Sequence, residues 1–155
     1  MNDPPDDYAG FVTRAIAFGI DIALIDLAAA IVAIVVGLGI SAFNLPDVVV
    51  TIAVVVGGLA FLAWSIGYFA TFWSTTGQTP GARVMGVRVV CAEGGEPVHL
   101  WTAVVRLAGM LLAALPLFAG FLLILLDDRR RGLQDRLART VVVYSSDAPA
   151  QLTKR

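Results

Sequence analysis

Two aspartates lie inside the first apolar stretch of this 155-residue chain, where a charged side chain is costly. An ionised carboxylate near the centre of a bilayer costs about 2.5 to 3.5 kcal/mol, so Asp21 and Asp26 need compensating partners. Arg14 precedes Asp21 by two helical turns, which places both side chains on one helix face, about 10.5 Å apart along the axis. Asp26 lies about 140° further around the helix. We therefore expect a site for a cation, a proton or a small ligand at Arg14 and Asp21, with Asp26 as a further candidate.

The same charges also have a structural interpretation. Charged residues near the membrane interface can hold helices together without binding any ligand. Arg106, at the mouth of a later apolar run, is the most available cation for either aspartate. The residues alone leave both interpretations open.

The remaining residue types give little support for catalysis. His99 and Cys91 are the chain's single histidine and single cysteine, so neither a metal-ligand spacing nor a nucleophile with its base can be assembled. The turn Gly77–Gly81 lacks the Gly-Lys-Ser/Thr ending of a phosphate-binding loop. We expect no metal, no cofactor and no enzymatic activity. The net charge of −1 gives no reason to expect a nucleic-acid partner.

The elements that must position these residues belong to a membrane protein. Hydrophobic residues make up 58% of the chain and charged residues 15%, against about 25% charged in an average soluble domain. The mean hydropathy is +0.82. This composition excludes a disordered chain and a disulfide scaffold, and it predicts a small all-α integral membrane protein in contact with the lipid bilayer.

Three runs without Asp, Glu, Lys or Arg are each long enough to cross a bilayer, for which about 20 apolar residues suffice. We predict transmembrane helices at 15–41 and 48–73. The third segment, 101–126, contains Gly109, Pro116 and Gly120, and we predict that it is broken or re-entrant. The three charge-free runs are Leu27–Pro46, Val48–Ala82 and Leu107–Leu126.

Basic residues predict the orientation, because Lys and Arg concentrate on the cytoplasmic side. The turn 44–47 contains none, whereas seven follow from Arg129 onward. We expect a multi-pass protein of the inner (plasma) membrane with both termini and the loop 77–99 in the cytoplasm. The first eight residues carry no basic n-region, so we expect no cleavable signal.

A small cytoplasmic β element completes the predicted domain, which extends over 8–144. Val84–Cys91 and Thr140–Tyr144 are rich in β-branched residues and too short to be stable alone, so we predict that they pair. The second strand ends the segment 127–144, which begins as a basic stretch. We expect the ends, 1–7 and 145–155, to be flexible.

Several surface patterns predict partners. Small residues recur every four positions in the first helix, which favours close helix packing and a homo-oligomer or a larger membrane complex. They are Ala29, Ala33, Gly37 and Ser41. Aromatic residues near the end of the second helix are typical of interfacial anchors. They are Phe61, Trp64, Tyr68, Phe72 and Trp73. Arg129, Arg130 and Arg131 are expected to meet anionic lipid headgroups.

Three motifs together resemble the RDD family of small bacterial membrane proteins, over nearly the whole chain from Tyr8 to Tyr144. They are Tyr8-Ala-Gly-Phe11 leading to Arg14 and Asp21, Gly77-Gln-Thr-Pro-Gly81 with Gly86-Val-Arg-Val-Val90, and Arg131-Gly-Leu-Gln-Asp135-Arg-Leu-Ala-Arg-Thr140. The resemblance implies that Arg14, Asp21 and a later aspartate are the residues after which the family is named. Asp135 is the best match for the later one, with Asp127 and Asp128 as competitors.

The chain departs from the family's pattern at two places. Ala82 stands where a lysine is common, and Gln134 where a histidine is common. The resemblance implies a membrane protein for which transport of unidentified ligands is the usual suggestion. Two hypotheses follow: transport through the Arg/Asp site, completed by oligomerisation, or a noncatalytic accessory or scaffold subunit of a larger membrane complex.

Overall fold

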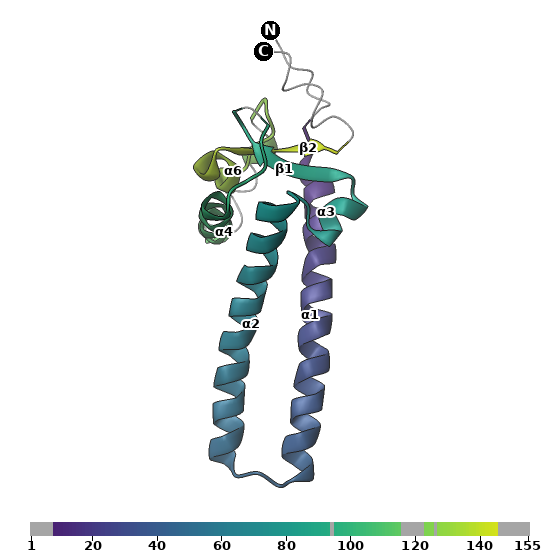
Figure 1. Cartoon of the computed structure of the whole chain (residues 1–155), viewed down its shortest axis with the longest axis vertical. Coiled ribbons are helices and arrows are strands. Elements are labelled where there is room, and N and C mark those ends of the chain that lie inside the picture. The colour runs from purple at the N-terminus through teal and green to yellow at the C-terminus, as the bar shows by residue number, and fades with distance from the viewer. Residues whose placement is uncertain (1–7, 94, 116–122, 126, 146–155) are drawn as a thin grey trace. The chain divides into compact units, whose positions relative to one another are not determined.

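A computed structural model describes residues 8–93, 95–115, 123–125 and 127–145. The chain divides into two units, which we call the hairpin unit (Ile22–Tyr68) and the sheet unit (the described residues of Met1–Asp21 and Phe69–Arg155). Figure 1 labels the elements. They are the helices α1 (Phe11–Ala42), α2 (Asp47–Thr75), α3 (Pro80–Val84), α4 (Leu100–Ala114) and α6 (Leu133–Ala138), and the strands β1 (Val87–Cys91) and β2 (Thr140–Tyr144).

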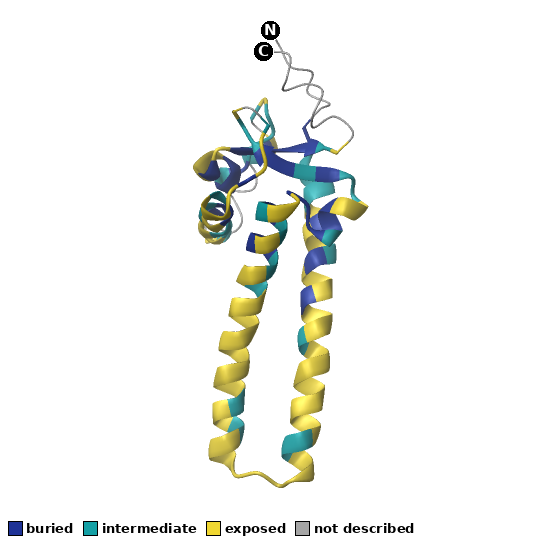
Figure 2. Cartoon of the chain, viewed as in Figure 1, coloured by how far each residue is buried: buried dark blue, intermediate teal, exposed yellow. Residues whose placement is uncertain are grey.

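The hairpin unit contains most of α1 and most of α2, two antiparallel apolar helices joined by a short turn (Figure 1). α1 has 32 residues and α2 has 29, and at about 1.5 Å per residue both are longer than the roughly 30 Å hydrocarbon core. Their side chains are almost all exposed (Figure 2), which distinguishes them from the core helices of a soluble protein. Two long apolar helices are therefore confirmed, each with bounds slightly wider than predicted.

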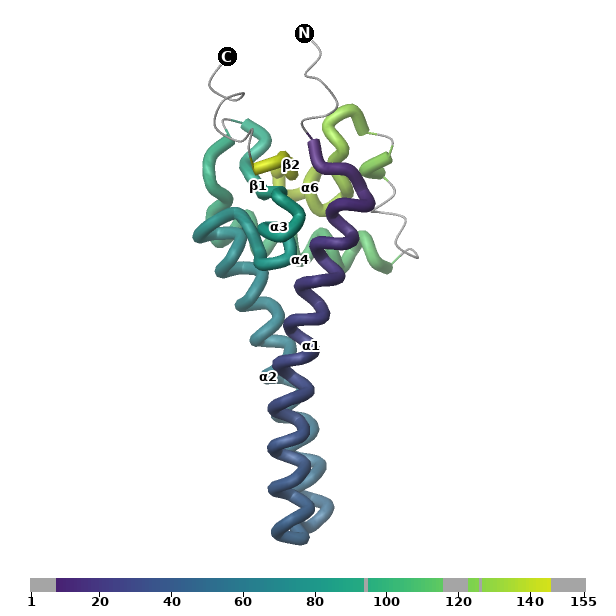
Figure 3. The backbone as a smooth tube through the Cα atoms, turned by 90° about the vertical axis from the view of Figure 1, so that its right-hand side faces the viewer, coloured from purple at the N-terminus to yellow at the C-terminus, as the bar shows by residue number. Residues whose placement is uncertain are grey.

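The strands pair as the sequence predicts. β1 and β2 lie next to each other (Figure 3). They pair antiparallel, with Val89 opposite Val142. The chain just before α1 extends this pairing, because Tyr8 forms a bridge with Val143 and the Ala9 amide donates to the Val142 carbonyl at 2.9 Å. Tyr8 packs with valines of both strands in a small buried core.

The first strand begins later than predicted. Residues 80–84 form the helix α3, because Pro80 favours the first helical turn and the Thr79 hydroxyl caps it by accepting from the Ala82 amide at 3.2 Å. Gly86 then has a φ of +63°, a conformation that other residues rarely adopt, and it turns the chain into β1.

Helix α4 packs against α6 through one face. Its buried residues are Ala103, Arg106, Gly109 and Ala113. The prediction that Gly109 interrupts this segment is wrong, since α4 continues through it. A Cβ at Gly109 would lie 2.8 Å from the Gln134 Cα, so glycine is what allows the two helices to approach.

The rest of the predicted broken segment falls mainly outside the described residues. Pro116 and Gly120 are not described, and beyond Leu115 only 123–125 of this segment is. The segments predicted to be flexible, 1–7 and 145–155, also lie outside the description, apart from Ser145.

Candidate functional site: a buried arginine–aspartate network

Asp135 is the centre of a buried polar network in the sheet unit. Its side chain has no exposed surface and lies in the first turn of α6, where the Gly132 amide donates to Oδ2 at 3.0 Å. Arg14 forms an ion pair with the same oxygen, with Nη1 at 2.5 Å. Arg106 forms a second ion pair with Oδ1 and also donates to the Thr140 hydroxyl at 2.7 Å. The network thereby joins the start of α1, α4, α6 and β2.

The charge state of Asp135 follows from these neighbours. Burial raises the pKa of this carboxyl, but the guanidinium groups of Arg106 and Arg14 and the Gly132 amide together hold the pKa below its ordinary value. Asp135 is therefore ionised at neutral pH. The network contains two cations and one anion.

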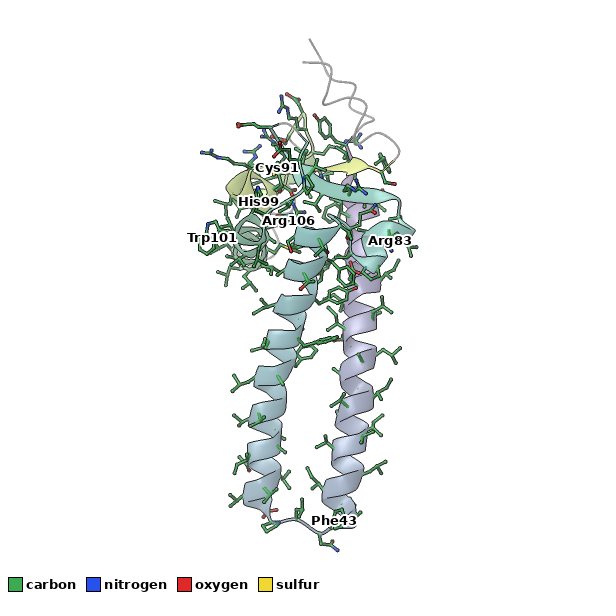
Figure 4. The ribbon with its side chains drawn as sticks, in the orientation of Figure 1. Phe43, Arg83, Cys91, His99, Trp101 and Arg106 are labelled. Atoms are coloured by element: carbon green, nitrogen blue, oxygen red, sulfur yellow. The ribbon has the colours of Figure 1, made fainter. Side chains whose placement is uncertain are left out.

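Arg106 is positioned by an aromatic side chain as well. Its guanidinium lies 4.9 Å from the centre of the Trp73 ring, a cation–π arrangement, and both side chains are buried. Trp73 was predicted to be an interfacial anchor, and this is wrong, because the ring packs against Arg106 and Phe69. Figure 4 shows Arg106 and Trp101 on different sides of α4, and Trp101 is 75% exposed.

Asp21 contacts the start of α3. The Thr79 hydroxyl donates to Oδ2 at 2.5 Å, and the Gly81 amide donates to Oδ1 at 2.8 Å. Gly81 is required for this approach, because a Cβ there would lie 2.1 Å from the Ala17 carbonyl oxygen. Asp21 therefore holds the Thr-Pro-Gly turn against α1.

The partners of the charged residues differ from the expected ones. Arg14 pairs with Asp135, which is 121 positions away, rather than with Asp21. Arg106 also pairs with Asp135, rather than with Asp21 or Asp26. Asp26 is exposed in the hairpin unit, where its side chain has no hydrogen bond or ion pair with any described residue. Helical spacing predicts which side chains share a face of α1. The ion-pair partner of Arg14 is nevertheless Asp135, because α6 brings this residue close to the start of α1.

A cavity of about 360 Å³ lies beside this network, inside the sheet unit. Three of the residues that line it carry a buried polar atom without a hydrogen-bond partner in the described part of the chain: Arg14 (Nη2), Arg106 (Nε) and Gln134 (Oε1). Asp21 and Thr79 also line the cavity, and most of the other lining side chains are apolar. Gln134 was not predicted as a site residue, although its position beside Asp135 was a usable signal.

Several arginines of the basic segment that begins at Arg129 form hydrogen bonds and ion pairs within the chain. Arg131 and Arg136 form ion pairs with Asp127 at 2.9 and 2.8 Å. Arg130 donates to the Tyr8 carbonyl at 3.0 Å, and Arg129 is half-buried. Two of the three arginines predicted to meet lipid headgroups thus have partners in the protein. Asp127 and the exposed Asp128 do not join Arg14, which leaves Asp135 as its partner.

The lowered pKa of Asp127 predicts that the folded protein loses stability in acid. Hydrogen bonds from Arg131, with a further contribution from Arg136, lower its pKa to about 2 despite the opposing effect of burial. A carboxyl whose pKa is lower in the folded state stabilises the fold above its unfolded pKa of about 3.9, and this contribution is lost as pH falls toward 2. We expect the thermal midpoint of the parent to fall between pH 4 and pH 2.

The matched variant is Asp127→Asn, which cannot form the ion pairs. Its stability should be lower by up to about 1 kcal/mol at pH 6, and the difference from the parent should shrink as pH falls through about 2. A constant difference at every pH would contradict the assignment.

The helices and the buried network together define the class of protein to which this chain belongs. Exposed apolar helices long enough to cross a bilayer, joined to a unit with a buried arginine–aspartate network, describe a small helical membrane-type protein. Residues 8–139 match the RDD family, and the chain belongs to it.

Curated relatives come from mycobacteria. The chain is 38% identical over 88 residues to the "Proline-rich antigen homolog" of two Mycobacterium tuberculosis strains, covering 57% of this chain and 35% of the relative. It is 33% identical over 82 residues to the "Proline-rich antigen" of Mycobacterium leprae, covering 53% of this chain and 32% of the relative. The match thus spans about a third of the length of these relatives. No solved structure matches.

Proposed function

We propose that this chain is a noncatalytic, transport-related protein of the plasma membrane that binds a small ligand in the cavity beside Asp135. The observation that carries the proposal is the set of three buried polar atoms on Arg14, Arg106 and Gln134 that have no partner among the described residues. An unsatisfied buried polar group costs about 1 to 3 kcal/mol. A ligand that pairs with these atoms removes that cost.

The arrangement favours a small ligand over a metal cation or a proton at Asp135. Both carboxylate oxygens already accept from guanidinium groups, and one of them also accepts from a backbone amide. A cation at this position would also meet the positive charges of Arg14 and Arg106. The unpaired atoms of the two arginines are donors, which attract oxygen acceptors instead.

Analysis of copurifying molecules tests the proposal. The parent is compared with Ala15→Leu, which places a larger side chain in the cavity wall, and with Ala108→Leu, the same substitution at an exposed position outside the cavity. Mass spectrometry of solvent extracts should find one compound in near-stoichiometric amount with the parent and Ala108→Leu, and not with Ala15→Leu. Identical extracts from all three would overturn the proposal. Uptake of that compound into liposomes then tests transport.

A topological proposal accompanies this function: both termini and the loop 77–99 are cytoplasmic. Tyr8, β1 and β2 belong to one hydrogen-bonded unit, which a bilayer cannot divide, so the sheet supports a common side for all three. α4 has 15 residues and a length of about 22 Å, which is too short to cross alone, and this favours a third apolar segment that does not span completely.

A reporter fused after Tyr144 checks the orientation. We expect cytoplasmic activity, equal to that of a fusion inserted at Glu93 in the loop. An extracellular signal at either site would contradict the proposed orientation.

A second candidate function is that of an accessory subunit in an oligomer or a larger membrane complex. It is favoured by the open surface along the small residues of α1, which are Ala29, Ala33, Gly37 and Ser41 and which we call the small-residue stripe. A Cβ placed on Gly37 would meet no atom of the described residues within 4 Å outside its own helix backbone and chain neighbours, so no described part of the chain occupies this position. Gly57 and Gly58 in α2 are equally open among the described residues. A helix of another chain is the proposed occupant.

Enlarging Gly37 tests this assembly. Gly37→Leu should reduce the oligomer fraction in mild detergent several-fold, because helices could no longer approach closely. Gly39→Leu, on a different face of the same helix, is the control. Equal oligomer size for Gly37→Leu and the parent would show that this face meets lipid.

A further inference from the structure

We infer that the cavity takes an amphipathic anion, a hydrocarbon chain that ends in a carboxylate or phosphate head. The inference rests on the proposed function, since it names the chemical class of the ligand for the same cavity.

The charge balance favours an anionic head. Arg14 and Arg106 share the single carboxylate of Asp135, so one positive charge of the network has no counterion within it. Each arginine also keeps one buried donor nitrogen without a partner among the described residues, Nη2 of Arg14 and Nε of Arg106. Hydrogen bonds from a guanidinium to an anionic oxygen are about twice as strong as neutral ones.

Asp21 is a carboxylate that also lines the cavity. It lies two helical turns along α1 from Arg14, about 10.5 Å away along the axis. Its two oxygens accept from Thr79 and Gly81, which directs the carboxylate toward the turn before β1. The arginine end of the cavity is therefore the end that attracts an anion.

Gln134 adds a contact that a simple anion does not satisfy. Its side chain is 97% buried, and its Oε1 is an acceptor without a partner in the described residues. A head that carries an O–H beside its anionic oxygen offers an acceptor for the arginine donors and a donor for the Gln134 oxygen. A singly protonated phosphate ester has both groups, and a carboxylate satisfies the two arginines alone.

The rest of the cavity is suited to a hydrocarbon chain. Apart from the polar residues named above, its walls are aliphatic and aromatic, and a volume of 360 Å³ falls at the lower end of the range for small-molecule pockets. An inorganic anion would leave these walls without a partner. Among the apolar lining residues are Phe11, Phe18, Phe69, Met110, Ile124 and Val142.

Trp73 provides a direct readout, because it lines the cavity and is 5% exposed. The chain has three tryptophans, and the other two, Trp64 and Trp101, are exposed. The full chain carrying Trp64→Phe and Trp101→Phe is reconstituted in phosphatidylcholine nanodiscs. Trp73 emission is then titrated with 12-bromododecanoate, 12-bromododecyl phosphate and 12-bromododecanol, since bromine quenches tryptophan at short range.

We expect saturable quenching by both brominated anions, with half-saturation at about tenfold lower concentration than for the alcohol, as one charge-assisted hydrogen bond implies. Unlabelled dodecanoate should reverse the quenching, and inorganic phosphate should not. Gln134→Leu should reduce the advantage of the phosphate over the carboxylate. Ala15→Leu should abolish saturation, and Ala108→Leu should leave it unchanged. If Ala15→Leu does not fold, Met110→Phe narrows the same cavity.

The outcomes separate the inference from the proposed function. Equal half-saturation for the alcohol and the anions would overturn the anionic head, and reversal by inorganic phosphate at the same concentration as dodecanoate would overturn the hydrocarbon chain. In both cases a copurifying compound that Ala15→Leu loses would still support ligand binding. If no probe saturates and the extracts are identical, both the inference and the proposed function fail.

Discussion

Replacing Asp135 by alanine should destabilise the protein more than any other single side-chain truncation. The change leaves Arg14 and Arg106 buried without their common counterion, and breaking a buried ion pair costs about 3 to 5 kcal/mol. Since a typical domain has a free energy of unfolding of about 5 to 15 kcal/mol, we expect a large loss of folded protein. Thermal unfolding in detergent and the yield of monodisperse protein measure the effect.

Matched variants separate charge from shape. Asp135→Asn keeps the volume but removes the charge, and it should destabilise nearly as much as alanine. Asp128→Asn, at an exposed position nearby, should change stability by less than about 0.5 kcal/mol. The triple change of Arg14, Arg106 and Asp135 to leucine should recover part of the loss, because apolar replacement of a complete buried network is often tolerated. Normal stability of Asp135→Asn would show that the network contributes no stability.

Gly81→Ala is the second substitution expected to have a large effect. A methyl group there would lie 2.1 Å from the Ala17 carbonyl oxygen and 2.9 Å from Asp21 Cγ, so α1 and the turn must separate. Both hydrogen bonds that Asp21 accepts from this turn would lengthen or break. Overpacking of this kind costs about 1 to 3 kcal/mol and more where backbone must move. We expect a cost at the upper end of that range, measured by thermal unfolding.

The control is the same substitution in open space. Gly19→Ala lies two residues before Asp21 on α1, and its added Cβ would meet no described atom within 4 Å outside its own helix backbone and chain neighbours. Alanine favours a helix over glycine by about 0.5 to 1 kcal/mol, so this variant should be as stable as the parent or more stable. Equal stability of Gly81→Ala and Gly19→Ala would mean that the turn and α1 are not in close contact.

Helix length and strand pairing could be predicted from the sequence because local composition decides them. Within a bilayer, a helix satisfies the hydrogen bonds of its own backbone, so charge-free apolar runs of 20 residues or more predict membrane helices. The helices α1 and α2 agree with this prediction. Outside the charge-free apolar runs, two short segments rich in β-branched residues were predicted to pair with each other, and β1 and β2 do pair. Thr79 and Pro80 are residue types that favour the start of a helix, and α3 does begin there. The β-branched residues that follow led to the prediction of a strand from Val84 onward.

The partners of the charged residues were decided by tertiary structure alone. The sequence identified Arg14, Asp21, Arg106 and Asp135 as costly or family-typical charges, but it could not say which carboxylate each arginine meets. Arg14 and Asp135 lie 121 positions apart, and their pairing depends on the docking of α6 against α4, which Gly109 permits. The unpaired atoms and the cavity arise in the same way. Packing of several segments creates them, and no local pattern of residue types specifies such an arrangement.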